Sequence, residues 1–488
     1  MKKALYIWFG MTVVSFLILI TFPLELHFDE AQYWSWSKVL QWSYYSKPPM
    51  IAFLNYVSSY FIGPSEVSVR LWSWFFANAT ALVFHFWVKQ VTKDEKKALK
   101  SLAIYYLFPH YWYTMLFFTT DVLLLFFYML SLFILYKIHE KDRLRDWILL
   151  GIVFSLGMLS KYAILVLLVP ILYMTFVRPK FSFLHFLIFV CIAAIGCFPI
   201  IAWASTHDYV SFRHLFFLSG ANHTSLDIVR GFRNIFEFLG GQLILLGGLV
   251  FFYIFSGVNK EVRKSGFIRT AVVIPYLLTI LVFILISFNR HRAANINWTL
   301  FVLCPMPYIL YEGLAQFRRK RFFLMTSIMT IMLYLFLFDG MYQGEQSFIA
   351  KVVPIKNVTK RLIGWKQLSN KLDHEVDHSK NTVVICTHYG IASELMFYGQ
   401  GKYEILYFNQ FSRMNQYDLW MSPVYDKYKG WDAIVVTDRP DLVDLEGNYE
   451  RCDNMELFKW SNQKYEGQQF YLHRINGIHI TDVEKHNF

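Results

Sequence analysis

The chain of 488 residues is 56% hydrophobic and 19% aromatic, and it carries a formal net charge of +12. This composition excludes an ordinary soluble globular protein, because runs of about 17 to 22 apolar residues recur and each can cross a bilayer about 30 Å thick. The positive charge lies mostly in alternate short loops between these runs. Membrane topology therefore accounts for it, and we expect no nucleic-acid partner.

Apolar runs predict about eleven transmembrane helices in the first 340 residues. In chain order, the runs lie near residues 4–22, 68–88, 98–117, 120–138, 147–160, 162–177, 183–203, 235–256, 270–288, 298–312 and 322–340. No small-residue cleavage site follows the first run, so we interpret it as a retained helix rather than a signal peptide. Residues 1–340 are therefore expected to form a polytopic α-helical membrane domain.

The distribution of basic residues predicts the orientation of these helices. The N-terminus and alternate loops hold about 21 Lys and Arg residues and the opposite loops hold about seven, and positive charge is typical of cytoplasmic loops. The N-terminus is therefore expected in the cytoplasm, and the chain in a plasma (inner) membrane. An odd number of helices then places residues 341–488 outside, in the periplasm or another extracytoplasmic space.

Residues 341–488 are more polar and predict a soluble α/β domain. Two short runs rich in β-branched residues, Thr382–Cys386 and Ala433–Thr437, are typical of buried strands. A helix is expected from Gly390 to Tyr398, followed by a strand-like segment from Tyr403 to Phe408. Because strands and helices alternate here, the sequence predicts a partly parallel sheet.

The loop over residues 23–67 is the candidate catalytic segment. Asp29 and Glu30 follow the first helix, and Lys47 precedes two prolines that fix its backbone. Charges this close to a bilayer usually serve a function: a carboxylate can act as a general base, and a lysine can hold a lipid phosphate. Alternatively, Asp29 caps a helix starting at Ala31 and Lys47 snorkels to headgroups. The loop's many aromatic side chains are expected at headgroup level.

Asp121 and Lys161 are charged residues at the ends of apolar runs. Asp121 opens a helix after Thr119 and Thr120, and it is the only acidic residue between Lys100 and Lys137. An active-site role competes there with a simple interaction with the helix dipole. Lys161 can hold a phosphate or can mark the edge of the membrane.

Further cations lie in segments expected outside. The second long external loop, residues 205–233, carries His207, Arg213 and His214, while Arg290 and Arg292 follow the ninth helix on the side where positive charge is not expected. An anionic substrate is one partner for such cations. The candidate phosphate-binding residues are Lys47, Lys161, Arg70, Arg213, Arg290 and Arg292.

Carboxylates and several cations on the outer side suit sugar transfer from a lipid-phosphate donor. In this reaction a carboxylate activates the hydroxyl group of the acceptor. The leaving group is a polyprenyl phosphate, which fixed cations stabilise.

At these same positions the chain resembles a known family. The motifs Asp29-Glu30-Ala31-x-Tyr33, Lys47-Pro48-Pro49 and Glu66-x-x-x-Arg70-Leu71 are similar to those of membrane glycosyltransferases related to dolichyl-phosphate-mannose protein mannosyltransferases. The resemblance is closest to the bacterial branch, which includes the aminoarabinose transferase acting on lipid A. Further matching motifs are Thr119–Asp121, Leu159–Tyr162, His207–Arg213, Phe238–Gln242, Asn295–Trp298 and Asn415–Trp420.

The resemblance implies a GT-C type fold and inverting transfer from a polyprenyl-phosphate sugar. It implies that Asp29 is the catalytic carboxylate, that Asp121 is the acid of the second motif and that Lys47 contacts the lipid phosphate. Tyr33 matches a tyrosine near that lysine. With His207 and His214 it is expected to contact donor or acceptor.

The resemblance identifies no certain cofactor, and it leaves a divalent metal open. In the aminoarabinose enzyme the lysine follows a Glu implicated in metal binding, whereas Ser46 stands here. The partners expected are the polyprenyl-phosphate sugar and a lipid or cell-envelope glycan acceptor.

Two other classes of function compete with the glycosyltransferase. A transporter or flippase of a lipid-linked sugar would also need cations for a phosphate, but it would often show two related halves, and the sequence has no internal repeat. A non-catalytic scaffold would use residues 341–488 to bind partners.

Overall fold

The structure of the chain is a computed structural model, and contacts divide it into two compact units. The helical unit comprises Met1–Ile20, Gln41–Ile51 and Arg70–Met332, and the mixed unit comprises Thr21–Leu40, Ala52–Val69 and Leu333–Phe488. The residues described are 2–177, 181–219, 227–245, 251–290, 292–316, 332, 335, 338–348, 359–377, 381–409, 413–442 and 445–480. The division of the chain at residue 340 stays a prediction.

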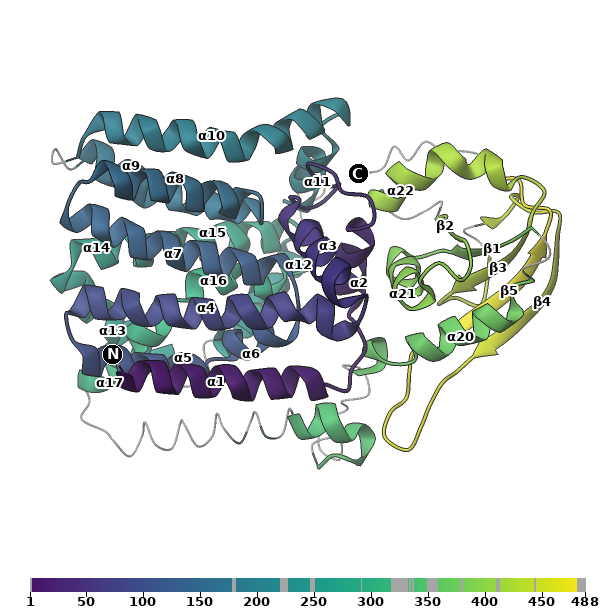
Figure 1. The fold of residues 1–488 in the computed structure, drawn as a ribbon, viewed down its shortest axis with the longest axis horizontal. Coiled ribbons are helices and arrows are strands. Elements are labelled where there is room, and N and C mark those ends of the chain that lie inside the picture. Colours follow the sequence, from purple (N-terminus) through teal and green to yellow (C-terminus); the bar gives the residue numbers. More distant parts are fainter. Residues whose placement is uncertain are drawn as a thin grey trace. The chain divides into compact units, whose positions relative to one another are not determined.

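The helical unit is built from long helices that run nearly parallel, as α1, α4, α7, α8 and α10 show in Figure 1. Its elements are α1 (Lys2–Thr21), α4 (Glu66–Thr92, with its first turn in the mixed unit), α5 (Glu95–Leu107), α6 (Pro109–Leu116), α7 (Thr120–Glu140), α8 (Leu144–Met158), η1 (Tyr162–Leu167), α9 (Leu168–Val177), α10 (Phe183–Thr206), α11 (Val210–Leu218), α12 (Ile228–Leu245), α13 (Phe251–Lys264), α14 (Gly266–Ile268), the π-helix η3 (Arg269–Val273), α15 (Ile274–Asn289), η4 (Ile296–Thr299), α16 (Leu300–Leu303) and α17 (Met306–Gln316).

Within the described residues, five helical segments are long and apolar enough to span a membrane. They are Lys2–Thr21, Glu66–Thr92, Thr120–Glu140, Phe183–Thr206 and Gly266–Asn289. The predicted run 98–117 is divided into α5 and α6, because Pro109 cannot continue the preceding helix. The run near 322–340 lies almost wholly outside the described residues, so the count of about eleven stays a prediction.

Close packing of helices in this unit depends on small residues. Helix α8 packs against both α7 and α10. A Cβ atom added to Gly196 of α10 would lie 2.6 Å from the Cα atom of Ser155 in α8. Only glycine therefore allows this approach, as is common where helices meet inside a bilayer.

The mixed unit contains a five-stranded sheet with the order β2-β1-β3-β5-β4. The first three strands in sequence are parallel to one another, whereas β5 is antiparallel to both β3 and β4. This confirms the predicted partly parallel sheet. The elements are α2 (Phe28–Trp36), α3 (Met50–Ile62, which begins in the helical unit), η5 (Gly344–Gln346), η7 (Lys360–Leu362), α20 (Trp365–Glu375), β1 (Thr382–Cys386), α21 (Tyr389–Gly399), β2 (Ile405–Tyr407), α22 (Gln416–Met421), η8 (Ser422–Tyr428), β3 (Asp432–Thr437), β4 (Arg451–Phe458) and β5 (Phe470–Asn476).

Strand β1 is buried on both faces of the sheet, and its successive residues point to opposite faces. On one face Val384 and Cys386 of β1 pack with side chains of α20 and α21. On the other, Val383 and Ile385 pack with residues of η8 and of the segment after β5. A near-continuous apolar run in β1 is the sequence signature of this double burial.

Helix α2, from the first long loop, belongs to this unit and packs on α21. The rings of Phe28 and Tyr389 lie 5.7 Å apart, and those of Trp34 and Phe397 lie 4.9 Å apart, both edge to face. Trp34 and Trp36 are 3% and 0% exposed. The expectation that they lie among lipid headgroups is therefore wrong: their rings are buried in protein, which the loop's composition alone could not reveal.

Candidate functional site

The helical unit holds a buried ion pair between Asp121 and Lys161. Asp121 lies in the first turn of α7, and Lys161 immediately precedes η1. The Lys161 Nζ atom is 2.5 Å from Asp121 Oδ1, and the Asn297 amide donates a hydrogen bond of 3.0 Å to Asp121 Oδ2. The two charged side chains are only 16% and 3% exposed. Each carboxylate oxygen of Asp121 therefore has a donor, and the lysine is held in one place.

A second set of hydrogen bonds holds the segment that carries Asn297. Thr299 donates to the Gln242 side-chain oxygen over 2.6 Å, and the Gln242 amide donates to the Ile296 carbonyl over 3.3 Å. These contacts tie η4 to α12. Four segments singled out in the sequence, around residues 121, 161, 242 and 297, thus converge, although they are up to 176 residues apart.

The segment that carries Lys47 joins the same part of the helical unit. The Lys47 carbonyl accepts a hydrogen bond of 3.0 Å from the Tyr44 N–H, which closes a tight turn. After the two prolines, the Met50 N–H donates to the Leu159 carbonyl over 3.0 Å. Lys47 is partly buried and is three residues from Met50, while Leu159 is two residues from Lys161. Two predicted phosphate-binding lysines thus lie on segments that contact each other.

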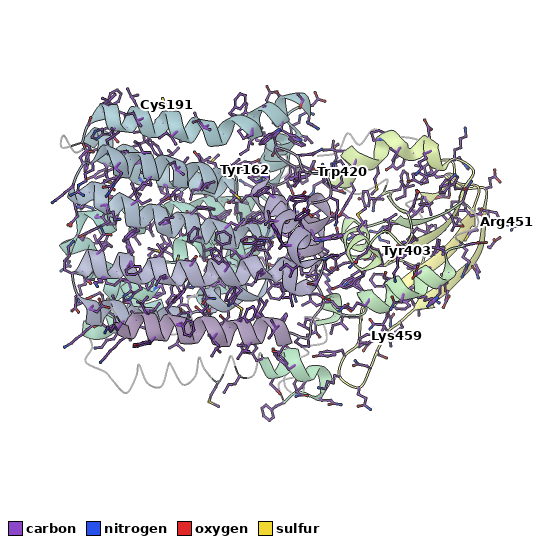
Figure 2. The ribbon with its side chains drawn as sticks, in the orientation of Figure 1. Tyr162, Cys191, Tyr403, Trp420, Arg451 and Lys459 are labelled. Carbon is purple, nitrogen blue, oxygen red and sulfur yellow. The ribbon has the colours of Figure 1, made fainter. Side chains whose placement is uncertain are left out.

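Helix α11 packs against the same turn. Ser211 donates a hydrogen bond of 3.0 Å to the Tyr44 carbonyl, and the His214 ring lies 4.7 Å from the Tyr45 ring. His214 is therefore brought to the Lys47 turn. Tyr162, which follows Lys161, is labelled in Figure 2 near the end of α8. The cluster thus lies where α7 begins and α8 ends.

Other predicted cations have varied surroundings. The Arg290 guanidinium lies 5.3 Å from the ring of Trp298, next to Asn297, so it adjoins the Asp121 cluster. Arg70 is 1% exposed, with its guanidinium 5.8 Å from the Phe117 ring. His207 stacks on Trp203 with ring centroids 4.0 Å apart.

Arg213 and Arg292 are exposed, and their part in the site stays a prediction. His291, between the two arginines of its cluster, lies outside the described residues.

Asp29 and Glu30 lie in the mixed unit, in the first turn of α2. Glu30 is fully buried, and its carboxylate accepts a hydrogen bond of 3.0 Å from the His27 N–H. The His27 ring in turn accepts from the Asp29 N–H over 3.3 Å, which completes a capping box. The helix begins at Phe28 and not at Ala31, so His27 and not Asp29 is its cap.

The Asp29 carboxylate stays accessible. Its side chain is 39% exposed, and Oδ2 is 4.0 Å from His27 Nδ1. Burial lowers the pKa of the nearby His388, so this imidazole is neutral near pH 7. Tyr33, in contrast, is 5% exposed and packs edge to face on Trp36. A role for Tyr33 in contacting donor or acceptor stays a prediction.

Sequence reasoning did not single out Glu25. Its carboxylate accepts hydrogen bonds from the backbone N–H groups of Trp365 (2.7 Å) and Lys366 (3.3 Å), which open α20. Burial raises the pKa of Glu25 to about 7, against the lowering effect of these two donors. The only signal in the sequence is a lone carboxylate between two leucines, which does not specify a partner 340 residues away.

Among the described residues, no three His, Cys, Asp or Glu side chains are grouped so as to hold a metal ion.

Comparison with known proteins supports the resemblance drawn from the motifs. Residues 46–203, which include Lys47, Asp121 and Lys161, match the family model described as dolichyl-phosphate-mannose-protein mannosyltransferase. The resemblance inferred from the motifs is thereby confirmed, and the shared segment includes the buried ion pair.

A curated relative extends this similarity. The lipid A galacturonosyltransferase RgtD of Rhizobium johnstonii is 28% identical over 301 residues, which make up 61% of this chain and 62% of the relative. The match thus spans less than two thirds of the relative's length.

Solved structures of ArnT from Cupriavidus metallidurans have the same fold. The apo structure matches with a TM-score of 0.65 at 12% identity, over 97% of this chain and 98% of that one. The structure bound to undecaprenyl phosphate matches with a TM-score of 0.66 at 11% identity, over 99% and 98%. This confirms the predicted class: a mainly helical membrane protein with a small C-terminal α/β part.

Proposed function

We propose that the protein is an inverting glycosyltransferase. It transfers a sugar from a polyprenyl-phosphate donor to a hydroxyl group of a lipid or cell-envelope glycan on the outer face of the membrane. The observation that carries the proposal is the buried Asp121–Lys161 pair on segments that contact the Lys47 turn. A relative that acts on lipid A and a structural neighbour that binds undecaprenyl phosphate support it.

The cations of the helical unit have the chemistry that a lipid phosphate requires. Lys47 and Lys161 supply ammonium groups, and Arg290 supplies a guanidinium held over Trp298. Because Asp121 fixes Lys161 and is itself held by Asn297, this charge is placed before the donor binds. A preorganised cation stabilises the negative charge that develops on a leaving phosphate. We assign Asp121 to positioning Lys161.

In the proposed step, the oxygen of the acceptor hydroxyl attacks the anomeric carbon of the sugar. The bond between that carbon and the phosphate oxygen breaks, and the polyprenyl phosphate leaves with the electron pair. Asp29 takes the proton of the hydroxyl, because its carboxylate is accessible whereas that of Glu30 is buried in the capping box. A single displacement of this kind inverts the anomeric configuration.

The orientation follows from the basic loops. With the N-terminus in the cytoplasm, the loop that holds Asp29 and the C-terminal α/β part both lie outside. Fusion reporters at residue 30 and at the C-terminus test this placement, since an active extracytoplasmic reporter at both sites is expected. A cytoplasmic signal at either site would overturn it.

The direct test measures transfer from a labelled polyprenyl-phosphate sugar by the purified full-length protein. Asp29→Asn should reduce kcat by at least about 100-fold, the usual effect of removing a general base. The control is Asp426→Asn, an exposed aspartate of the same unit, which should transfer normally. Full activity of Asp29→Asn would refute the base assignment. Movement of the lipid-linked sugar across liposomes with no glycosidic product would instead favour a flippase.

A comparison of envelope glycolipids and glycoproteins by mass spectrometry, with and without the protein, tests the acceptor class. Loss of one sugar mass from a lipid is expected, because the curated relative acts on lipid A. Loss from a protein would overturn the lipid assignment.

A further inference from the structure

The mixed unit contains a cavity of about 550 Å³, a size typical of small-molecule sites. It lies among α2, α21, β2 and α22, all within the mixed unit. Its wall is largely aromatic and apolar, and Figure 2 labels two of the lining residues, Tyr403 and Trp420. The lining residues include Trp34, Ser35, Lys38, Met396, Tyr403 and Trp420.

Lys38 is the only charged residue that lines this cavity among the described residues. Its ammonium group lies 4.2 Å from the centroid of the Trp34 ring, which holds the charge at the wall by a cation–π contact. No carboxylate of the described residues pairs with it, and partial burial lowers the pKa of Lys38. Lys38 is exposed, so its ammonium group at the cavity wall is accessible to an anionic ligand.

Hydrogen bonds that involve the motif Asn415–Trp420 hold another part of the cavity lining. The Tyr417 hydroxyl is 2.6 Å from the Ser35 hydroxyl and 2.8 Å from that of Ser393, and all three groups are buried. The Tyr417 ring lies edge to face on Trp420, 5.9 Å away. This motif therefore joins α2 to α21 and α22 and sets the position of an indole at the cavity.

We propose that this cavity binds the anionic sugar headgroup of the acceptor, with its phosphate or carboxylate on Lys38 and its sugar ring against the aromatic wall formed with Trp420. Sugar rings carry C–H groups on their faces, which pack on aromatic rings, and hydroxyl groups at their edges. An aromatic wall with one cation suits such a ligand better than a purely apolar chain. The inference rests on the proposed function, since it names the acceptor of that reaction.

The first experiment measures binding without catalysis. Saturation-transfer NMR of the purified full-length protein compares N-acetylglucosamine 1-phosphate with neutral N-acetylglucosamine and with inorganic phosphate. The sugar phosphate should bind at least about tenfold more tightly than either other probe, because it uses both the cation and the aromatic wall. Lys38→Gln and Trp420→Ala should each raise its Kd about tenfold. Lys429→Gln, an exposed lysine outside the cavity, is the matched control and should change nothing.

The second experiment separates the acceptor from the donor, whose headgroup is also a sugar phosphate. Lys38→Gln should raise KM for the acceptor about tenfold and leave KM for the lipid-linked donor unchanged. A rise in KM for the donor alone would overturn the acceptor assignment. Equal binding of all three probes, or an unchanged Kd in both variants, would refute the site while leaving the glycosyltransferase proposal intact. Lys38-dependent binding in a protein that transfers no sugar would refute the proposed function and retain an anionic-sugar site.

Discussion

Replacing Asp121 by Asn tests whether this carboxylate acts through Lys161 or directly on the substrate. The substitution keeps the shape of the side chain and removes the charge that faces the Lys161 ammonium at 2.5 Å. Without that charge, Lys161 loses the partner that fixes its position. We therefore expect Asp121→Asn to lower kcat/KM for the lipid-linked donor.

The size of the effect follows from the loss of a fixed cation. Lys161 is 16% exposed, so its charge is only weakly screened by water. Removing one preorganised group that stabilises developing charge costs about 100-fold or more in rate. We therefore expect a decrease of about 100-fold in kcat/KM, which corresponds to about 3 kcal/mol of transition-state stabilisation. Lys161→Met should cause a similar decrease, because it removes the cation itself.

A double-mutant cycle on the transfer reaction distinguishes the two roles. If Asp121 only positions Lys161, the double variant should lose about as much as Lys161→Met alone, with a coupling energy of about 2–3 kcal/mol. The measurement is kcat/KM with labelled donor for all four proteins, together with the apparent Tm of each to exclude unfolding. Additive losses, near about 10,000-fold in the double variant, would refute the positioning role and give Asp121 its own contact with the reacting groups.

Three further predictions concern stability. Burial raises the pKa of Glu25 to about 7, so the folded state favours the protonated carboxyl. The contribution of Glu25 to the free energy of unfolding should be greatest below about pH 4.5. It should fall by about 3 kcal/mol as the pH rises through 7. Glu25→Gln should flatten this dependence of the apparent Tm between pH 5 and 8, and an unchanged slope would contradict the assignment. Gly196→Ala should force α8 and α10 apart and lower the apparent Tm, at a cost of about 1–3 kcal/mol. Gly10 has open space around it, so Gly10→Ala should leave the Tm unchanged. Equal changes of Tm in the two variants would refute the packing argument. Tyr417→Phe should speed hydrogen exchange in α2, because two buried serine hydroxyls lose a hydrogen-bond partner at a cost of about 1 kcal/mol each. Unchanged exchange would show that the Tyr417 hydroxyl does not stabilise α2.

Segments with strong local patterns were predicted well. The strands Thr382–Cys386 and Asp432–Thr437 are continuous apolar runs, and the structure has them as β1 and β3 within one residue of the expected bounds. Long apolar helices such as α7 and α10 also match the expected spans. Hydrophobic periodicity and length are local properties, so a sequence displays them directly.

Local patterns were less informative about how the first long loop is used. Its tryptophans have the composition of an interfacial helix, but Trp34 and Trp36 are buried, and the Trp34 ring packs on Phe397, more than 300 positions later. A ring buried in protein and a ring at a headgroup have the same chemistry. Only the partner distinguishes them, and the partner is set by tertiary contacts.

The sequence by itself determined that this is a membrane protein with an α/β part, and its ordered motifs indicated the family that it resembles. It also supplied Asp121, Lys161 and the motif around Asn297 as separate candidates. The tertiary structure alone decided that these three meet in one hydrogen-bonded ion pair, that Glu30 is a capping residue and that Glu25 holds α20. The reason is physical. Each apolar run can form a membrane-spanning helix by itself, so its sequence alone reveals it. A buried charge is stable only beside its partner, and that partner lies far away in the chain.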